Sequence, residues 1–352
     1  MTGPFDHPWL GGLLGDDEAA AIWSAERQLS HMLAFEVAWS RACGAAGLFD
    51  EEQAESAARA IEQAHVDPSS LWDGMARDGV PIPALVRQLR AEAGTAAEAV
   101  HEGATSQDVV DSALALTLHE TSNLLQERLE ALLDALDALA ERFGAVPLMG
   151  RTRMQAARKI RVADRIASWS LPLSDHLERL ARLRGVVERV QIGGAAGDRA
   201  ALGVQAEEIV AAVADELGLQ AAEVWHARRD GVADYASFLS LVSGSLGKIG
   251  QDICLMAQQG LDEIALSGGG GSSAMAHKRN PVKAEVLVAL ARFNAVQVSA
   301  MHQALVHEQE RSGAAWTLEW MVLPQMAQAT ARSLALALEL VEGVEAMGES
   351  DA

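Results

Sequence analysis

Aromatic residues and cysteines are scarce in this 352-residue sequence. Aromatic residues make up 4% of it, with one Tyr and six Phe, and alternating β-branched runs, which favour strands, are few. The two cysteines, Cys43 and Cys254, lie far apart without metal-site spacing. We therefore expect no disulfide framework, and we expect the protein to be cytoplasmic.

Long apolar runs are also missing. No uninterrupted apolar stretch approaches the ~18 residues that a membrane-spanning helix needs. The first residues lack the basic and apolar regions of a signal peptide. We therefore expect no association with a membrane.

Basic residues are outnumbered. Lys and Arg total 28 against 49 Asp and Glu, so the formal net charge is −21. This charge repels phosphate and argues against a nucleic-acid partner. Hydrophobic residues make up 49% of the chain, close to the globular average, which excludes intrinsic disorder.

Residues that favour helices dominate the composition of the chain. The segment 107–143 contains neither Pro nor Gly, and from Leu125 to Leu139 its leucines recur at steps of four and three. That spacing predicts one apolar stripe along a helix of ~50 Å. Similar patterns predict further long helices over 155–190 with a kink at Pro172, over 230–263, over 316–343, and from about Pro281. Four or five such helices predict a bundle, and their wide apolar stripes favour a homo-oligomer.

The first hundred residues have shorter helical patterns. Breaks fall at 44–47, at Asp67-Pro68 and at 79–83. We expect a small helical N-terminal domain over 1–100, a central long-helix domain over 101–345, and a tail over 346–352.

The most informative stretch runs from Ser267 to Pro281. Four glycines at 268–271 precede hydroxyl, cationic and amide side chains, namely Ser272, Ser273, His277, Lys278, Arg279 and Asn280. A glycine hinge, cations and a helix start at Pro281 together indicate an anion-binding lid. The alternative is a flexible linker, which does not account for the cluster of cations.

Two other stretches stand at predicted helix starts. In the first, Thr105 or Ser106 suits an N-cap and Asp108 suits the positive end of the helix dipole, but capping does not explain His101 or Gln107. In the second, 150–155, Arg151 and Arg153 oppose that dipole. They would suit a carboxylate clamp, and the alternative is two solvated surface arginines.

These three stretches together resemble the fumarase/aspartase superfamily of lyases. That superfamily carries a Thr-Ser pair, a Gly-Arg-Thr-x-x-Gln element and a Gly-Ser-Ser-x-Met-Pro-x-Lys-x-Asn loop, and all three occur here in the same order, within a match over about 5–340. The segments Ala-Thr-Ser-Gln-Asp, His-Lys-Arg-Asn-Pro, 225–230 and 308–320 are most similar to its carboxymuconate cycloisomerase branch. Two departures are Arg153, where most members have His, and Ala276, where the loop usually has Pro.

The resemblance implies an all-α fold with a small helical N-terminal domain, a long central bundle and a C-terminal domain that is short or absent. It implies a homotetramer whose active sites are each shared by three subunits, without metal or organic cofactor. The implied reaction converts a tricarboxylate, 3-carboxy-cis,cis-muconate, to 4-carboxymuconolactone in protocatechuate degradation. Alternatives are a C–N lyase of the adenylosuccinate lyase type, which releases fumarate, and a non-catalytic structural oligomer.

The resemblance also assigns roles to residues. Ser272 is the expected proton-transfer group, with Ser273 as the second candidate, and Lys278 joins them in the catalytic set. The expected substrate-binding residues are His101, Thr105, Ser106, Gln107, Arg151, Arg153, Gln155, His277, Arg279, Asn280 and Arg311.

Overall fold

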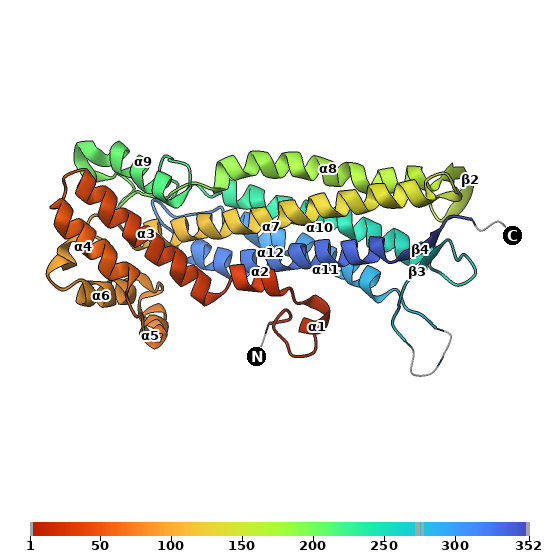
Figure 1. Cartoon of the computed structure of the whole chain (residues 1–352), viewed down its shortest axis with the longest axis horizontal. Coiled ribbons are helices and arrows are strands. Elements are labelled where there is room, and N and C mark those ends of the chain that lie inside the picture. The colour runs from red at the N-terminus through yellow and green to blue at the C-terminus, as the bar shows by residue number, and fades with distance from the viewer. Residues whose placement is uncertain (1–2, 272–274, 276–277, 350–352) are drawn as a thin grey trace.

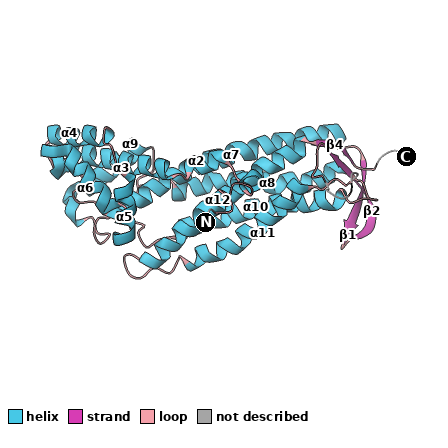
Figure 2. Ribbon diagram, turned by 90° about the horizontal axis from the view of Figure 1, so that it is seen from below, coloured by secondary structure: helices cyan, strands magenta, loops and turns pink. Residues whose placement is uncertain are grey.

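The computed structural model describes residues 3–271, 275 and 278–349. The molecule is elongated. Long helices run side by side along it, shorter helices gather at one end, and the strands lie at the other (Figures 1 and 2).

Five long helices form the bundle, as the apolar periodicity predicts. They are α7 (Ser106–Phe143), α8 (Val162–Val187), α10 (Asp230–Met256), α11 (Val282–Gln303) and α12 (Gly313–Glu342). The expected leucine stripe of α7, including Leu125, Leu132 and Leu139, is buried in the main hydrophobic core. This burial stabilises the helix more than its intrinsic propensity does.

Short helices build the other end of the molecule. These are α3 (Ala25–Ala45), α4 (Glu51–Glu62), α5 (Pro68–Asp78), α6 (Ile82–Ala93) and a 3₁₀ turn, η1 (Gly94–Ala99). Before them in the chain, α1 (Gly11–Leu14) and α2 (Asp17–Ile22) lie beside the bundle, where α2 contacts α7 and α12 (Figure 1). Only α3, with 21 residues, is long. The breaks between them fall where Gly and Pro predict.

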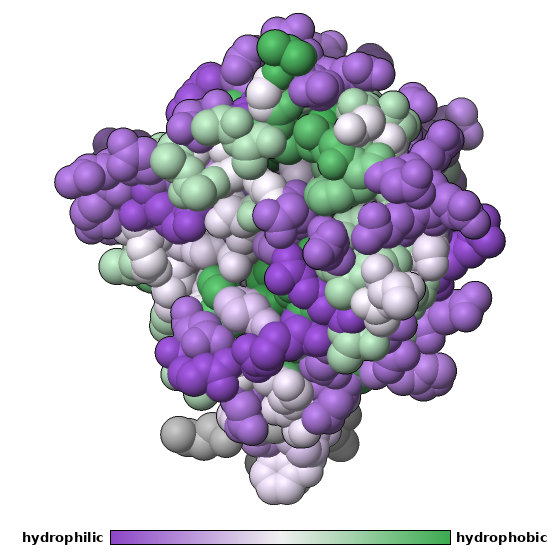
Figure 3. Space-filling view, turned by 90° about the vertical axis from the view of Figure 1, so that its left-hand side faces the viewer, coloured by the Kyte–Doolittle hydropathy of each residue, from purple (hydrophilic) through white to green (hydrophobic). Residues whose placement is uncertain are grey.

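A second hydrophobic core lies among these short helices. It also takes in Ile209, Val210 and Val213 of α9 (Ala206–Leu217), which follows the turn η2 (Ala200–Gln205) and packs against α3. The core at this end therefore draws on residues beyond the first hundred. Its outer surface is mostly hydrophilic, with apolar areas between the charged side chains (Figure 3).

Two small antiparallel sheets close the opposite end. Strands β1 (Pro147–Thr152) and β2 (Gln155–Arg161) form a hairpin, and β3 (Ile264–Leu266) pairs with β4 (Val344–Met347). The prediction of a helix from Gln155 is wrong for its first seven residues. The run Gln155–Lys159 contains good helix formers, but pairing with β1 outweighs that weak preference.

Other boundaries need smaller corrections. Pro172 lies inside α8, as expected. Helix α10 ends at Met256 and not near 263, where Gly260 takes a left-handed conformation with φ of 88°.

One described helix, α11, is long and apolar enough to cross a membrane by length and composition alone. Only 33% of its most apolar window is buried. Core helices of soluble proteins pass the same test, so this feature is weak evidence for a membrane span, but it does mean that an apolar surface is exposed.

Candidate active site

Asp108 organises the start of α7. Its buried carboxylate accepts hydrogen bonds from the backbone N–H of Thr105 (3.0 Å), Gly193 (2.8 Å) and Gly194 (2.9 Å), and it bonds His226 Nε2 at 2.8 Å. Four partners occupy its two oxygens, so Asp108 serves structure and not ligand binding. Position 193 has room only for glycine, because a Cβ there would lie 2.6 Å from the His226 ring.

His101 lies in the loop before α7. Its Nδ1 is 2.6 Å from Oε1 of Glu36, a fully buried residue of α3. Burial lowers the pKa of His101, but the charge and hydrogen bond of Glu36, with the charge of Asp108, outweigh it and raise the pKa above its ordinary value.

Gln107 links this loop to Arg311, between α11 and α12. The Gln107 amide oxygen accepts from Arg311 Nε at 2.8 Å, and its nitrogen donates to Asp111 at 2.9 Å. Arg311 is exposed, and its terminal nitrogens have no hydrogen-bond partner among the described residues. The structure thus brings together His101, Thr105, Ser106, Gln107 and Arg311, all of them predicted site residues.

A buried ionic cluster supports Gln107 from behind. Arg229 is 2% exposed and donates from Nη1 to Asp111 (2.8 Å) and from Nε to Glu319 (2.9 Å). Trp316 Nε1 also donates to Asp111, at 3.2 Å. Burial raises the pKa of the Glu319 carboxyl, although the charge of Arg229 opposes it. The stretches 225–230 and 308–320, singled out in the sequence, contain Arg229, Trp316 and Glu319, but Asp111 comes from α7, and only the fold shows that the four side chains form one cluster.

The second predicted stretch forms the tip of a hairpin. Arg153 and Met154 occupy the two-residue turn with φ of 48° and 67°, as a type I′ turn requires. The expectation that Arg151 and Arg153 open a long helix is therefore wrong. Arg153 and Gln155 are exposed at the tip.

Arg151 already has a carboxylate partner in the chain. Its Nη1 lies 2.6 and 2.7 Å from the two oxygens of Glu263, immediately before β3. This ion pair joins β1 of the hairpin to the residue that precedes β3. The clamp predicted at Arg151 thus holds a protein side chain in this structure.

The third stretch lies at the same end as the hairpin. Gly270 and Asn280 exchange backbone hydrogen bonds of 3.0 and 2.9 Å, which closes the base of the loop just before α11. Lys278 and Arg279 are exposed. A cavity of about 600 Å³ is lined by Gly268–Gly270, Arg279, Asn280 and neighbouring residues. Ser272, Ser273 and His277 lie outside the described residues.

The three motifs do not meet within one chain. Helix α7 has 38 residues, which corresponds to a length of about 57 Å. Thr105 and Ser106 stand at its start, whereas the hairpin and the base of the glycine loop lie toward its far end (Figure 1). A site built from all three motifs requires more than one copy of the chain.

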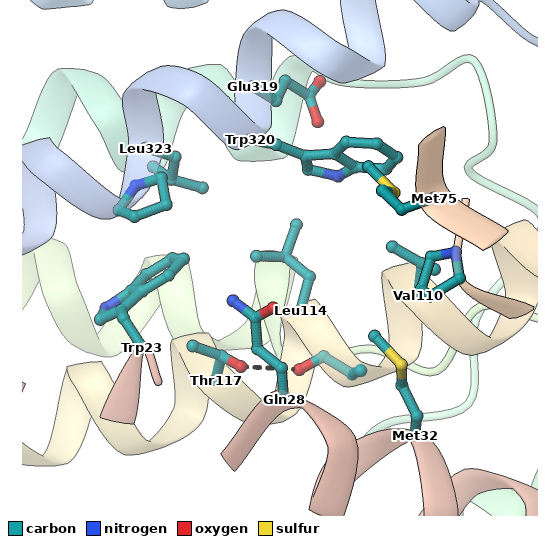
Figure 4. A pocket seen from close by; sticks show the side chains of 13 residues that line it. Trp23, Gln28, Met32, Met75, Val110, Leu114, Thr117, Glu319, Trp320 and Leu323 are labelled. Carbon is teal, nitrogen blue, oxygen red and sulfur yellow. Dashed lines mark hydrogen bonds between the residues drawn. The ribbon is translucent and has the colours of Figure 1, made fainter. Parts of the chain in front are cut away.

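An apolar pocket beside α7 does not suit an anionic ligand. It has a volume of about 250 Å³ and is lined by residues that include Trp23, Met32, Leu114 and Trp320 (Figure 4). Its lining includes no Lys, Arg or His, and its one carboxyl group, Glu319, is paired with Arg229. A polyanion would find no counter-charge there.

Metal binding finds no support in the part of the chain that is described. Its residues include no group of three or more His, Cys, Asp or Glu side chains placed to hold a metal ion.

A bundle of long helices with the three motifs divided between its opposite ends defines an all-α protein of the fumarase/aspartase type. A family model described as lyase matches residues 15–298, and the chain belongs to this lyase family.

Individual members of the family can be compared with this chain. The chain is 40% identical over 333 residues to a 3-carboxy-cis,cis-muconate cycloisomerase of Pseudomonas aeruginosa, covering 92% of this chain and 72% of the relative. It is 32% identical to an N-acetyl-S-(2-succino)cysteine lyase of Enterococcus italicus, with 93% and 73% covered. The crystal structure of 3-carboxy-cis,cis-muconate lactonizing enzyme from Pseudomonas putida superposes with a TM-score of 0.90 at 34% identity, over 96% of this chain and 77% of that one.

Proposed function

We propose that this chain catalyses the cycloisomerisation of 3-carboxy-cis,cis-muconate to 4-carboxymuconolactone. The observation that carries the proposal is its 40% identity, over 92% of its length, to a relative named for that reaction. This similarity favours the cycloisomerase over both alternatives, the adenylosuccinate lyase type and the non-catalytic oligomer.

The reaction is an internal addition. A carboxylate oxygen of the substrate bonds to one carbon of a double bond, and the electron pair of that bond moves to the neighbouring carbon, which takes up a proton. A trianion becomes a dianionic lactone, and the balance needs only that proton. Negative charge builds up on the carboxylate next to the protonated carbon, so fixed cations and N–H donors stabilise the transition state.

The chain carries these donors in three groups. His101, Thr105, Ser106 and Arg311 lie at the start of α7, Arg153 and Gln155 lie at the hairpin tip, and Lys278, Arg279 and Asn280 lie at the loop base. Because the net charge of the chain is −21, attraction of a trianion has to be local, which screening over ~8 Å permits. We assign proton transfer to Ser272, activated by a nearby cation and by closure of the lid.

A shared site also requires an oligomer, and we propose a homotetramer in which three subunits build each site. Leu241 of α10, Val296 of α11 and Met321 of α12 are 51%, 73% and 61% exposed. Apolar side chains on three bundle helices suit burial between copies. We further propose that the enzyme acts in protocatechuate degradation in the cytoplasm.

The test is the ultraviolet absorbance of 3-carboxy-cis,cis-muconate after addition of purified protein. We expect the diene absorbance to disappear with the wild type and to persist with Ser272→Ala, which should remain the same oligomer. Substrate retained by the wild type would refute the proposed reaction. An active Ser272→Ala would move the proton-transfer role to Ser273 or elsewhere.

A second substrate separates the proposal from lyase chemistry. N-acetyl-S-(2-succino)cysteine should give no fumarate, measured by its absorbance. Fumarate release without muconate turnover would instead favour the activity named for the Enterococcus italicus relative.

A further inference from the structure

Glu36 carries a buried carboxylate at a position whose surroundings would suit an apolar side chain. It is 0% exposed and lies among buried apolar residues of α3, including Phe35, Ala38 and Trp39. Its Oε1 bonds His101, and its Oε2 has no hydrogen-bond partner among the described residues. Burying a carboxylate with one oxygen unpaired lowers the stability of the fold. The hydrogen bond to His101 is the side-chain contact that offsets part of this cost among the described residues.

His101 is held in an uncommon conformation. Its φ of 59° places it in the left-handed region, where a residue with a Cβ is strained and where strain often accompanies function. The side chain is 13% exposed. Nδ1 is engaged by Glu36, whereas Nε2 has no hydrogen-bond partner in the described part of the chain and is not a buried atom. Nε2 is therefore the nitrogen that a ligand can reach.

We propose that Glu36 is a positioning residue that holds His101 as an imidazolium, whose Nε2–H binds a carboxylate of the substrate. The inference rests on the proposed function, because it places the substrate at the start of α7. Glu36 sets both the ring orientation and the charge, since a carboxylate at Nδ1 fixes a proton on that nitrogen and favours a second one on Nε2.

The charges around His101 agree with this role. Glu36 faces it from α3, Asp108 from α7 and Arg90 from α6. The two carboxylates favour the imidazolium, and burial and Arg90 oppose it, with the pKa raised overall. His101 consequently keeps its charge to a higher pH than a free histidine and loses it as the pH rises further. One carboxylate anchor of the site is therefore lost at alkaline pH.

The first test needs no substrate. Histidine Cε1 is labelled with ¹³C, and the His101 resonance, assigned by its loss in His101→Gln, is titrated by NMR in the wild type and in Glu36→Gln. The amide of Gln fits the same space without the charge, so the titration midpoint of His101 should move to lower pH. An unchanged midpoint would overturn the proposal.

A matched control exists on the same bundle. His119 Nδ1 bonds Glu188 at 2.9 Å, and this histidine is 39% exposed. Glu188→Gln should leave the His101 midpoint and the kinetics unchanged. A shift of His101 in that variant would mean that the effect is general charge removal and would count against a specific role of Glu36.

The second test is kinetic. Near pH 8 we expect KM for the muconate to rise about tenfold in Glu36→Gln, as loss of a charge-assisted hydrogen bond allows, with kcat within about twofold. The two KM values should converge at acid pH, where His101 is charged in both proteins. Equal KM at every pH, or a pH-independent loss of kcat, would overturn the binding role.

The experiments distinguish failure of the proposed reaction from failure of the role assigned to Glu36. If neither protein consumes the muconate, the proposed function fails, and the NMR titration still decides whether Glu36 sets the charge of His101.

Discussion

The side chain of Gln107 stands between a buried ion cluster and an exposed cation. It accepts from Arg311 Nε at 2.8 Å and donates to Asp111 at 2.9 Å. Because an amide has a donor and an acceptor on opposite atoms, it transmits the fixed position of Asp111 to the guanidinium of Arg311. The surface cation is thereby oriented by a core that solvent does not reach.

Replacement of Gln107 tests that arrangement. Gln107→Met keeps the length but removes both polar atoms, so Arg311 loses its anchor, and the KM for the substrate should rise about tenfold. Steady-state kinetics measures this. Gln126→Met, which removes an exposed bond to Glu130 on the same helix, is the control and should leave KM unchanged. Equal KM in both variants would exclude the role of Gln107.

Loss of the buried cation should damage the fold. Arg229→Met leaves Asp111 and Glu319 buried without their partner, and breaking such a pair costs about 3–5 kcal/mol. Urea unfolding followed by circular dichroism should show a markedly lower midpoint. Arg59→Met, which removes an exposed pair with Glu55, should shift it little. A stable Arg229→Met would mean that the cluster contributes little net stability.

Mixing two inactive variants tests the shared site. Ser106→Ala and Lys278→Ala alter motifs at opposite ends of the bundle. Hybrid tetramers would contain sites in which both wild-type residues meet, and random assortment predicts activity up to about a quarter of wild type. The assay is muconate turnover after the two proteins are unfolded and refolded together.

A mixture of Lys278→Ala with Asn280→Ala is the matched control. Both changes lie at one loop base, so each loop carries one defect and activity should stay low. Equal recovery in the two mixtures would contradict a site divided between subunits.

His176 should make the fold sensitive to acid. Burial, with the charge of Arg179, lowers the pKa of His176 to about 4, while the unfolded chain titrates near ~6.5. Between these values the unfolded state binds more protons, so stability falls as the pH drops from about 6.5 to about 4 and then levels off for this group. Scanning calorimetry should show a smaller loss of Tm over that range in His176→Gln. An identical loss would assign the acid sensitivity to other groups.

Local patterns were sufficient to predict the long helices, but not all of their boundaries and not the hairpin. The leucine steps in α7, the breaks at Asp67-Pro68 and the helix start after Pro281 each depend on neighbouring residues alone. The segment Gln155–Lys159 has helix-forming residues, but it lies opposite β1, and that partner is set by the tertiary fold. Glu36 did leave a local signal, since it is a charged residue inside the apolar run from Phe35 to Trp39.

The sequence by itself determined the helical class, a bundle of four or five long helices and the three motifs with their cations, because periodicity and composition act over a few turns. Only the tertiary structure decided which of these residues meet. It paired Arg151 with Glu263, Gln107 with Arg311 and Glu36 with His101, contacts that join segments up to 204 positions apart. It also set the motifs at opposite ends of a rigid helix, because the length of α7, once formed, keeps them apart.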